Sequence, residues 1–327
     1  MPVEQGSSSC DVIELMKQRL SGFETEKGRL QGLNYQPKSN EEVIISTSPK
    51  AGTTWLQQIC HQLRAATNGD ESMEFQEISE VVPWLELAHD LNQDLSAPQY
   101  GDKQGLPRLF KTHAWQSHCP KGCKTIVVLR DPMDVVVSFY KFFENWFFDE
   151  GTVSVDDFSR EFWLARGVPT SKMNNASYFV HLTSWYKCRE NPLVLFVFFE
   201  DLIDDLLGQV KRIAMFMSTE RHDFCQDDII DHAAKRSSFA FMKEHESKFD
   251  ENLTKLGLNE ACGLPIGAGM KDTKLNMGKV GTGRATLSKE LQEAIQQKWR
   301  DVVEPVTRCA TYEELRIAFR NEELSKH

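Results

Sequence analysis

The chain has 327 residues, of which 40% are hydrophobic and 26% charged, and its formal net charge at pH 7 is −10. This is an ordinary globular composition, sufficient for one large α/β domain or two small ones. The negative charge argues against a broad nucleic-acid surface, so any anion site must be a local basic pocket. No apolar run approaches the about 20 residues of a membrane span, and the N-terminus lacks a signal-peptide pattern. We therefore expect a cytosolic protein with reduced cysteines and neither a membrane nor a nucleic acid as partner.

The N-terminal part is predicted to be an extension, residues 1–38, that precedes the domain. Residues 1–9 are small and polar, which is typical of disorder, and apolar residues at helical spacing over 12–20 predict a short helix. No internal repeat or long linker interrupts the remainder. We therefore expect a single domain over 39–320, followed by a short tail over 321–327.

A strand, a loop and a helix are predicted in succession near the start of this domain. The apolar run Val43–Ile45 predicts a strand buried on both faces, and the apolar spacing from Leu56 to Leu63 predicts a helix. The loop between them contains Lys50, Gly52 and two threonines. A helix N-terminus attracts anions through its backbone N–H groups and its dipole, so this loop predicts a phosphate or sulfate cradle. An ordinary turn between strand and helix is the alternative.

This loop is not a Walker A motif, in which the lysine follows the second glycine. Here Lys50 precedes Gly52 by two residues, and no glycine lies four residues before Lys50. Any phosphate site in this loop must therefore be of another kind.

Apolar strands alternate with helices through the middle of the chain. Strands are predicted over 107–113, 125–129 and 193–199, and helices over 134–148, 156–164, 176–190 and 203–217. This alternation predicts an α/β fold with a mostly parallel central sheet flanked by helices, similar to the P-loop-like nucleotide-binding folds. Ligands of such sheets bind beyond the carboxyl ends of the strands, which places Lys50, His113, Arg130 and Glu200 at one edge.

The C-terminal third begins with a glycine-rich segment over 250–284. Its length and composition predict an irregular binding loop or lid. A last helix is predicted to begin after Ser288, which can cap it. His113, His118 and two nearby cysteines do not have the spacing of a zinc site, so no metal is expected.

A second candidate anion site follows the strand over 125–129. Arg130 ends that strand, and Ser138 lies eight residues later on the next predicted helix. A bidentate guanidinium and a hydroxyl suit a terminal phosphate group. The alternative is an ion pair between Arg130 and Asp131 or Asp134.

Together the two loops resemble the cytosolic sulfotransferase superfamily, over roughly residues 40–300. The resemblance implies that the first loop binds the 5′-phosphosulfate of 3′-phosphoadenosine-5′-phosphosulfate (PAPS), and that Arg130 and Ser138 bind its 3′-phosphate. It further implies that His113, in Phe-Lys-Thr-His, is the catalytic base and that Lys50 and Lys111 are active-site lysines. The other implied cofactor-binding residues are Ala51, Gly52, Thr53, Thr54, Trp55, Phe199, Ser237, Phe239, Met242, Met277, Gly278 and Lys279.

The function implied by the resemblance is in-line transfer of a sulfuryl group from PAPS to a hydroxyl or amine of a small acceptor, without a metal. The product is adenosine 3′,5′-bisphosphate (PAP). Trp55 and Phe239 would enclose the adenine. Candidates for the acceptor pocket are aromatic residues that could equally belong to the core: Trp84, Phe142, Trp146, Phe147 and Phe148. An ATP-dependent phosphotransferase is the alternative enzyme, although it would require a Walker A lysine and a magnesium-binding aspartate.

Three departures from the family pattern bear on affinity, activity and assembly. Asn276 and Met277 stand where the family has Arg and Lys, and Phe199 stands where it often has Tyr. A catalytically weak nucleotide-binding homologue is therefore a further alternative. The usual dimer motif has no clear match after Gly281, so we expect a monomer or an atypical dimer.

Overall fold

A four-stranded sheet lies at the centre of the protein. The computed structural model describes residues 8–66, 72–97, 106–270 and 281–324. The strands are β1 (Val43–Thr47), β2 (Leu109–Thr112), β3 (Lys124–Leu129) and β4 (Val194–Phe198). They lie in the order β2-β1-β3-β4, and all three neighbouring pairs are parallel. The predicted α/β fold with a parallel central sheet is confirmed, and each strand lies within or next to its expected range.

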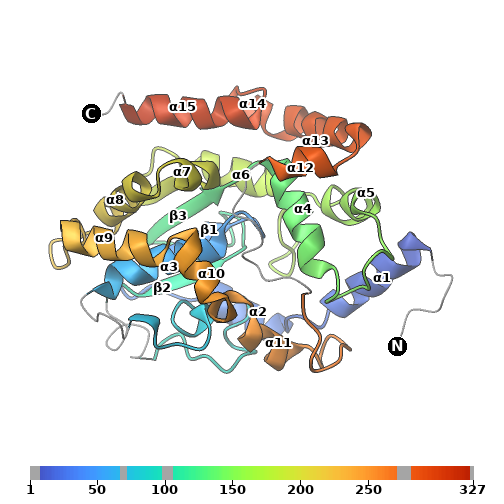
Figure 1. The fold of residues 1–327 in the computed structure, drawn as a ribbon, viewed down its shortest axis with the longest axis horizontal. Helices are drawn as coiled ribbons and strands as arrows, with labels where there is room; N and C mark the ends of the chain where they lie inside the picture. Colours follow the sequence, from blue (N-terminus) through green and yellow to red (C-terminus); the bar gives the residue numbers. More distant parts are fainter. Residues whose placement is uncertain (1–7, 67–71, 98–105, 271–280, 325–327) are drawn as a thin grey trace.

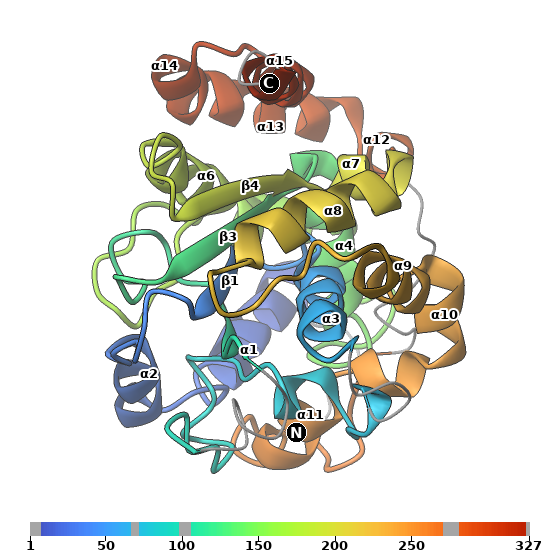
Figure 2. The same cartoon turned by 90° about the vertical axis from the view of Figure 1, so that its left-hand side faces the viewer.

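Helices cover both faces of the sheet, as Figures 1 and 2 show. Successive strand residues alternate between two apolar clusters, since Val43 and Ile45 belong to one cluster and Ile44 to the other. The face that carries Val43 and Ile45 is covered by α3 (Thr53–Arg64), α8 (Leu206–Met217) and α9 (Asp227–Arg236). The second cluster includes residues of α1 (Ser9–Leu20), α4 (Pro132–Phe143), α6 (Tyr178–Tyr186), α13 (Lys289–Val302) and α15 (Tyr312–Leu324).

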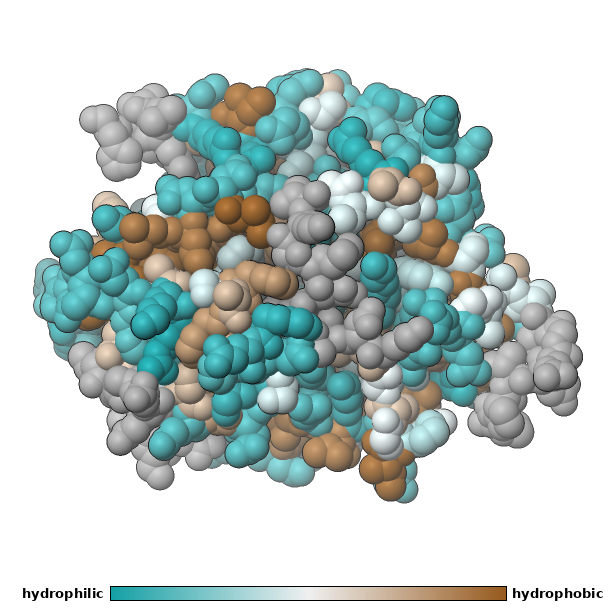
Figure 3. All heavy atoms as spheres, viewed as in Figure 1, coloured by the Kyte–Doolittle hydropathy of each residue, from teal (hydrophilic) through white to brown (hydrophobic). Residues whose placement is uncertain are grey.

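Shorter elements connect these layers and build the rim of the sheet. They are α2 (Glu26–Leu33), η2 (Ile78–Glu80), α5 (Val155–Phe158), η4 (Ser159–Trp163), α7 (Phe199–Asp204), α10 (Phe239–Glu244), η5 (Glu246–Phe249), α11 (Asn252–Leu258), α12 (Thr282–Thr286) and α14 (Glu304–Thr307). No helix in the described ranges is both long enough and apolar enough to cross a membrane. Figure 3 shows hydrophilic side chains over much of one face, with a hydrophobic patch beside α7 and α8.

Helix α2 was not expected, because its sequence contains two glycines and reads as a connector. Both glycines are sites of close approach. A Cβ atom at Gly32 would lie 1.7 Å from the carbonyl oxygen of Leu85, and one at Gly28 would lie 2.4 Å from a carboxylate oxygen of Asp90. These glycines therefore allow the helix to pack against its neighbours.

Two of the expectations about the helices were wrong. Helix α4 ends at Phe143 instead of continuing to residue 148, and the next residues form a tight turn in which Asn145 has φ 64°. The helix capped by Ser288 is present as α13, but it is not the last, because α15 follows it. The glycine-rich segment is not irregular throughout, because α11 and the short α12 are helical.

Candidate active site

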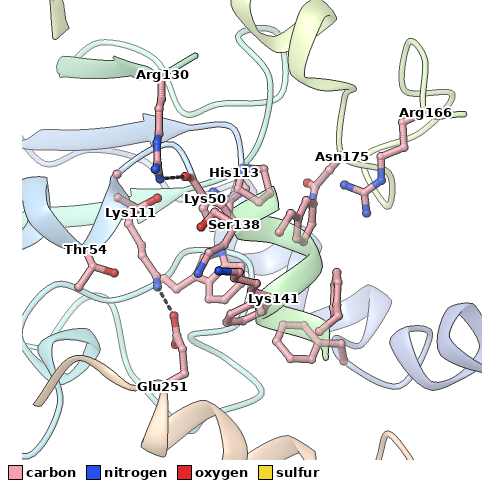
Figure 4. Close-up of a pocket in the computed structure, with 18 of the residues that line it drawn as sticks. Lys50, Thr54, Lys111, His113, Arg130, Ser138, Lys141, Arg166, Asn175 and Glu251 are labelled. Atoms are coloured by element: carbon pink, nitrogen blue, oxygen red, sulfur yellow. Dashed lines mark hydrogen bonds and ion pairs between the residues drawn. The ribbon is translucent and has the colours of Figure 1, made fainter. Parts of the chain in front are cut away.

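A cavity of about 660 Å³ opens at the carboxyl ends of the strands. Segments far apart in the sequence meet in it, and Figure 4 shows ten of its side chains with labels. The described residues that line it include Lys50, Thr53, Thr54, Trp55, Trp84, Lys111, His113, Arg130, Ser138, Phe142, Phe199, Phe239 and Met242. The parallel topology thus brings Lys50, His113 and Arg130 together at one edge of the sheet, as predicted, whereas Glu200 does not line the cavity.

The loop between β1 and α3 has the backbone of an anion cradle. Gly52 is the N-cap of α3 in the left-handed region, with φ 112°, and no side chain caps the first N–H groups of this helix. A Cβ atom at Gly52 would lie 2.7 Å from the Phe199 ring, so glycine is required for space as well as conformation. The uncapped N–H groups at the start of this 12-residue helix face a cavity also lined by Lys50 and Thr54.

His113 is held in one tautomer by the end of β1. Its Nδ1–H donates to the carbonyl oxygen of Thr47 over 2.9 Å, so Nε2 retains its lone pair. Its backbone N–H donates to the buried carboxylate of Glu86 over 2.7 Å, which fixes the strand end. Burial, with Lys111 nearby, lowers the pKa of His113 to about 3. The ring is therefore neutral at physiological pH and able to accept a proton at Nε2.

Lys111 lies beside His113 in a fully buried ion pair. Its Nζ is 3.2 Å from Oε1 of Glu251 and 4.4 Å from the centre of the Trp84 ring. The same indole packs edge-on against His113, with ring centres 4.9 Å apart. The conformation of Glu251 is unusual, because this non-glycine residue has φ 57°. The carboxylate of Glu251 and the ring of Trp84 therefore hold the Lys111 ammonium at the wall of the cavity.

Arg130 follows β3 and reaches the first loop. Its Nη1 donates to the carbonyl oxygen of Lys50 over 3.3 Å, and its guanidinium lies 4.3 Å from the centre of the Phe199 ring. Its Nε is buried and has no hydrogen-bond partner. Burial lowers the pKa of Arg130, while Asp134 and Glu200 favour its charged form. The expected alternative, a direct ion pair of Arg130 with Asp131 or Asp134, is not found within the described residues.

A chain of hydrogen bonds holds the Arg130 segment in place. The Tyr178 hydroxyl donates to the carbonyl oxygen of Arg130 over 2.7 Å. The next residue, Asp131, donates its backbone N–H to Oε1 of Glu200 over 3.0 Å, and the other oxygen of Glu200 accepts from the hydroxyl of Tyr312 on α15. The position of Arg130 therefore depends on contacts from α6, α7 and the C-terminal helix.

The C-terminal glycines are anchored on α4. The backbone N–H groups of Gly281 and Gly283 donate to the two carboxylate oxygens of Asp134 over 2.8 and 2.7 Å. This carboxylate is therefore occupied by backbone donors rather than by Arg130. The predicted loop residues Met277, Gly278 and Lys279, together with Asn276, lie outside the described residues.

Aromatic residues line the end of the cavity near α10. The Nε1–H of Trp55 donates to the carbonyl oxygen of Ser237 over 2.7 Å, and its ring meets Phe199 at 5.3 Å between centres. Phe239, 39% exposed, and the buried Met242 line the same cavity. Ser237 does not line it, but its hydroxyl is buried without a hydrogen-bond partner.

Only part of the predicted acceptor pocket lies in the cavity wall. Trp84 and Phe142 line it, and the Lys50 ammonium lies 4.3 Å from the centre of the Phe142 ring. Trp146, Phe147 and Phe148 do not line it and are buried in the core, so their assignment to the pocket was wrong. The sharp turn after Phe143 directs them against other aromatic rings, including Phe23.

Several residues that the sequence reasoning missed also line the cavity. Glu251 arrives from the glycine-rich segment, and Leu20, Phe23 and Glu24 arrive from α1 and the turn after it. Arg166 belongs to a loop after η4 that contributes seven further residues to the wall: Gly167, Val168, Pro169, Thr170, Met173, Asn174 and Asn175. No local motif marks these positions, because long-range packing alone brings them to the site.

The fold and the cavity define a parallel α/β protein with a cationic ligand site at the strand ends. Comparison with known proteins specifies the family. The sulfotransferase domain family matches residues 40–305. Sulfotransferase 1B1 of Canis lupus familiaris is 31% identical over 211 residues, which cover 63% of this chain and 67% of that protein.

Solved structures agree at the level of the fold. Retinol dehydratase, in a complex with retinol and PAP, superposes with a TM-score of 0.63 at 19% identity, covering 90% of this chain and 94% of that one. Mouse sulfotransferase SULT7A1, complexed with PAP, gives a TM-score of 0.57 at 21% identity, covering 86% and 90%. The chain belongs to the sulfotransferase domain family and is a sulfotransferase.

Proposed function

We propose that the enzyme transfers a sulfuryl group from PAPS to a hydroxyl or amine of a small acceptor, with His113 as general base. The observation that carries this proposal is the convergence of Lys50, His113 and Arg130 in one cavity. These side chains supply a cation at the first loop, a neutral imidazole with an available Nε2, and a second cation at the end of β3.

The side chains of the cavity fit a nucleotide that carries two anionic ends. The α3 N-terminus, Lys50 and Thr54 offer donors to a 5′-phosphosulfate, with the buried Ala51 and Thr53 shaping the loop. Arg130, whose buried Nε lacks a partner, and Ser138 offer donors to a 3′-phosphate. The adenine would lie between Trp55 and Phe239, near Phe199, Ser237 and Met242. PAP in two structural neighbours supports this choice of nucleotide.

The mechanism assigns a separate task to each polar side chain. PAPS, when bound, supplies the activated sulfuryl group. Nε2 of His113 takes the proton of the acceptor hydroxyl or amine, since Nδ1–H is committed to Thr47. Lys50 stabilises the negative charge that develops toward the nucleotide, and Lys111, held by Glu251, stabilises charge beside the acceptor. Catalysis would then depend mainly on the positioning of the reactants and on electrostatic stabilisation of the transition state, as in phosphoryl transfer.

The proposal is tested by transfer from ³⁵S-labelled PAPS to a panel of phenols, sterols, alcohols and amines, with EDTA present. Transfer of label to an acceptor supports it, and transfer that continues in EDTA separates it from magnesium-dependent phosphoryl transfer. Binding of PAP without transfer to any acceptor would instead favour the catalytically weak homologue.

Arg130→Met is expected to remove most of the preference for PAP over adenosine 5′-monophosphate, which lacks the 3′-phosphate. Charged hydrogen bonds contribute about 1.5–3 kcal/mol, so the ratio of the two affinities should fall by about 10-fold to 100-fold. Calorimetry with both nucleotides measures this ratio. The matched control is Arg160→Met, which removes an exposed arginine that does not line the cavity. An unchanged ratio in Arg130→Met would place the 3′-phosphate elsewhere.

Trp55→Leu is expected to weaken PAP binding by about 1–3 kcal/mol, the usual contribution of an aromatic ring stacked on a base. Trp55→Phe keeps a stacking ring but loses the hydrogen bond to Ser237, so it serves as the matched variant. We expect Trp55→Phe to retain most of the affinity even where its melting temperature falls. Equal losses of affinity in the two variants would show that the hydrogen bond, and not stacking, matters.

A further inference from the structure

Arg166 is a cation in the cavity wall that the proposed transfer reaction does not use. Its guanidinium lies over aromatic rings, 4.3 Å from the centre of Phe162 and 5.3 Å from that of Phe139. Burial lowers its pKa to about 10, so it is charged at neutral pH. The aromatic faces stabilise the charge but satisfy none of its five N–H donors.

Within the described part of the chain, Arg166 has no ion-pair partner or hydrogen-bond acceptor. The acidic residues that line the same cavity are already occupied. Glu24 accepts two hydrogen bonds from Arg29 over 2.7 and 2.8 Å, Glu251 pairs with Lys111, and Asp134 accepts from two backbone N–H groups. The Arg166 side chain is only partly exposed. A partly desolvated guanidinium without an anion beside it is stabilised when a ligand supplies one.

The loop that carries Arg166 lies at the acceptor end of the cavity. Arg29 of α2 donates to the side-chain oxygen of Asn175 over 2.7 Å and to the carbonyl oxygen of Lys172, which ties this loop to the α1–α2 region. The adenine end is built instead by Trp55, Phe239 and Met242. Figure 4 shows Arg166 and Asn175 on the side of the cavity away from Arg130.

We propose that Arg166 makes this enzyme selective for acceptors that carry an anionic group, such as a carboxylate, at the end remote from the hydroxyl or amine that is sulfated. The inference rests on the proposed function and adds the chemical class of the acceptor. A planar guanidinium binds a carboxylate through two parallel hydrogen bonds. Apolar residues of the same cavity wall, such as Phe142 and Phe143, offer contacts to an intervening carbon skeleton. Lys141, on the exposed rim of the cavity, adds a second positive charge.

A homologous series of ω-hydroxyalkanoic acids, from hydroxyhexanoic to hydroxyhexadecanoic acid, tests this proposal beside the corresponding methyl esters. The dissociation constant of each compound is measured by calorimetry with and without PAP, and kcat/KM is measured with PAPS. We expect the acid to be preferred over its ester at one favoured chain length, by about 10-fold to 100-fold, as for a charge-assisted hydrogen-bonded pair. The favoured length reports the separation between the reacting hydroxyl and Arg166.

Arg166→Met keeps an unbranched side chain against Phe162 but removes the charge. It should abolish the preference for the acid while leaving affinity for the ester and for PAP unchanged. Arg166→Lys should retain part of the preference, and Arg160→Met, in the same segment, should retain all of it. A preference that survives in Arg166→Met, or no preference at any length in the wild type, would overturn the inference.

The design separates this inference from the proposed function. Loss of PAP affinity in Arg166→Met would assign the residue to the nucleotide and overturn the inference alone. Transfer to the esters with no preference for the acids would also leave the proposed function intact. If no compound receives label, the proposed function fails, and the calorimetric comparison of acid with ester still decides the role of Arg166.

Discussion

His113→Ala is expected to lower kcat by about 10²-fold to 10⁴-fold, the usual contribution of a general base. The loss should fall on kcat, because in the proposed mechanism Nε2 of His113 acts on the acceptor and Nδ1–H is held by Thr47. Affinity for PAP should therefore be retained. Single-turnover kinetics with PAPS, together with PAP calorimetry, separate the two quantities. Near-normal turnover in this variant would remove His113 from the mechanism.

The pH dependence of the wild-type enzyme provides an independent check on this residue. A base must be unprotonated to act, and a lowered pKa keeps the imidazole neutral at lower pH. Since the pKa of His113 is lowered to about 3, the acid limb of kcat/KM should lie well below the about 6.5 of an ordinary histidine. If instead the acid limb of kcat/KM lies near pH ~6.5 and disappears in His113→Ala, the ring is more solvated during catalysis than in this structure.

Lys50→Met is expected to lower kcat by at least about 10²-fold, a loss typical of removing one group that stabilises transition-state charge. Its ammonium lies against the Phe142 ring at the mouth of the first loop, where charge would develop as the bond to the nucleotide breaks. Methionine keeps the length and apolar stem of lysine, so the loop should retain its conformation. PAP affinity should fall as well, unlike in His113→Ala.

The control for this variant is Lys289→Met, which removes an exposed lysine of α13 that does not line the cavity. It should leave both kcat and PAP affinity unchanged. If Lys50→Met lost PAP affinity but retained kcat at saturating PAPS, Lys50 would serve binding equally in the ground and transition states.

The strands and the two loops were predictable because their signals are local. Each buried strand is a continuous apolar run, and polar residues such as Lys50, His113 and Arg130 follow directly at its end. Parallel strands then place these ends at one edge regardless of loop details. The position of Glu251 could not be predicted in this way, because its partner Lys111 lies 140 residues away in the sequence.

Residue type alone could not separate the cavity wall from the core. Phe142 and Trp146 are both large aromatic residues in one run, but Phe142 lines the cavity and Trp146 is 3% exposed within the core. The difference depends on the end of α4 at Phe143 and on the left-handed conformation of Asn145. Arg166 was missed for a related reason, since cations that stack on aromatic rings have no sequence spacing of their own.

The hydrogen bonds from Tyr312 through Glu200 to Asp131 link the C-terminal helix α15 to Arg130 and so to the proposed binding of a nucleotide. Thermodynamic coupling between two sites is reciprocal. If docking of α15 increases the affinity of the Arg130 segment for an anion, a bound anion must increase the stability of the docked α15 by the same factor. Salt bridges of Arg316 and Arg320 to Asp201 add to that docking. The C-terminal helix would thus be an energetic component of the proposed nucleotide site, although none of its described residues lines the cavity.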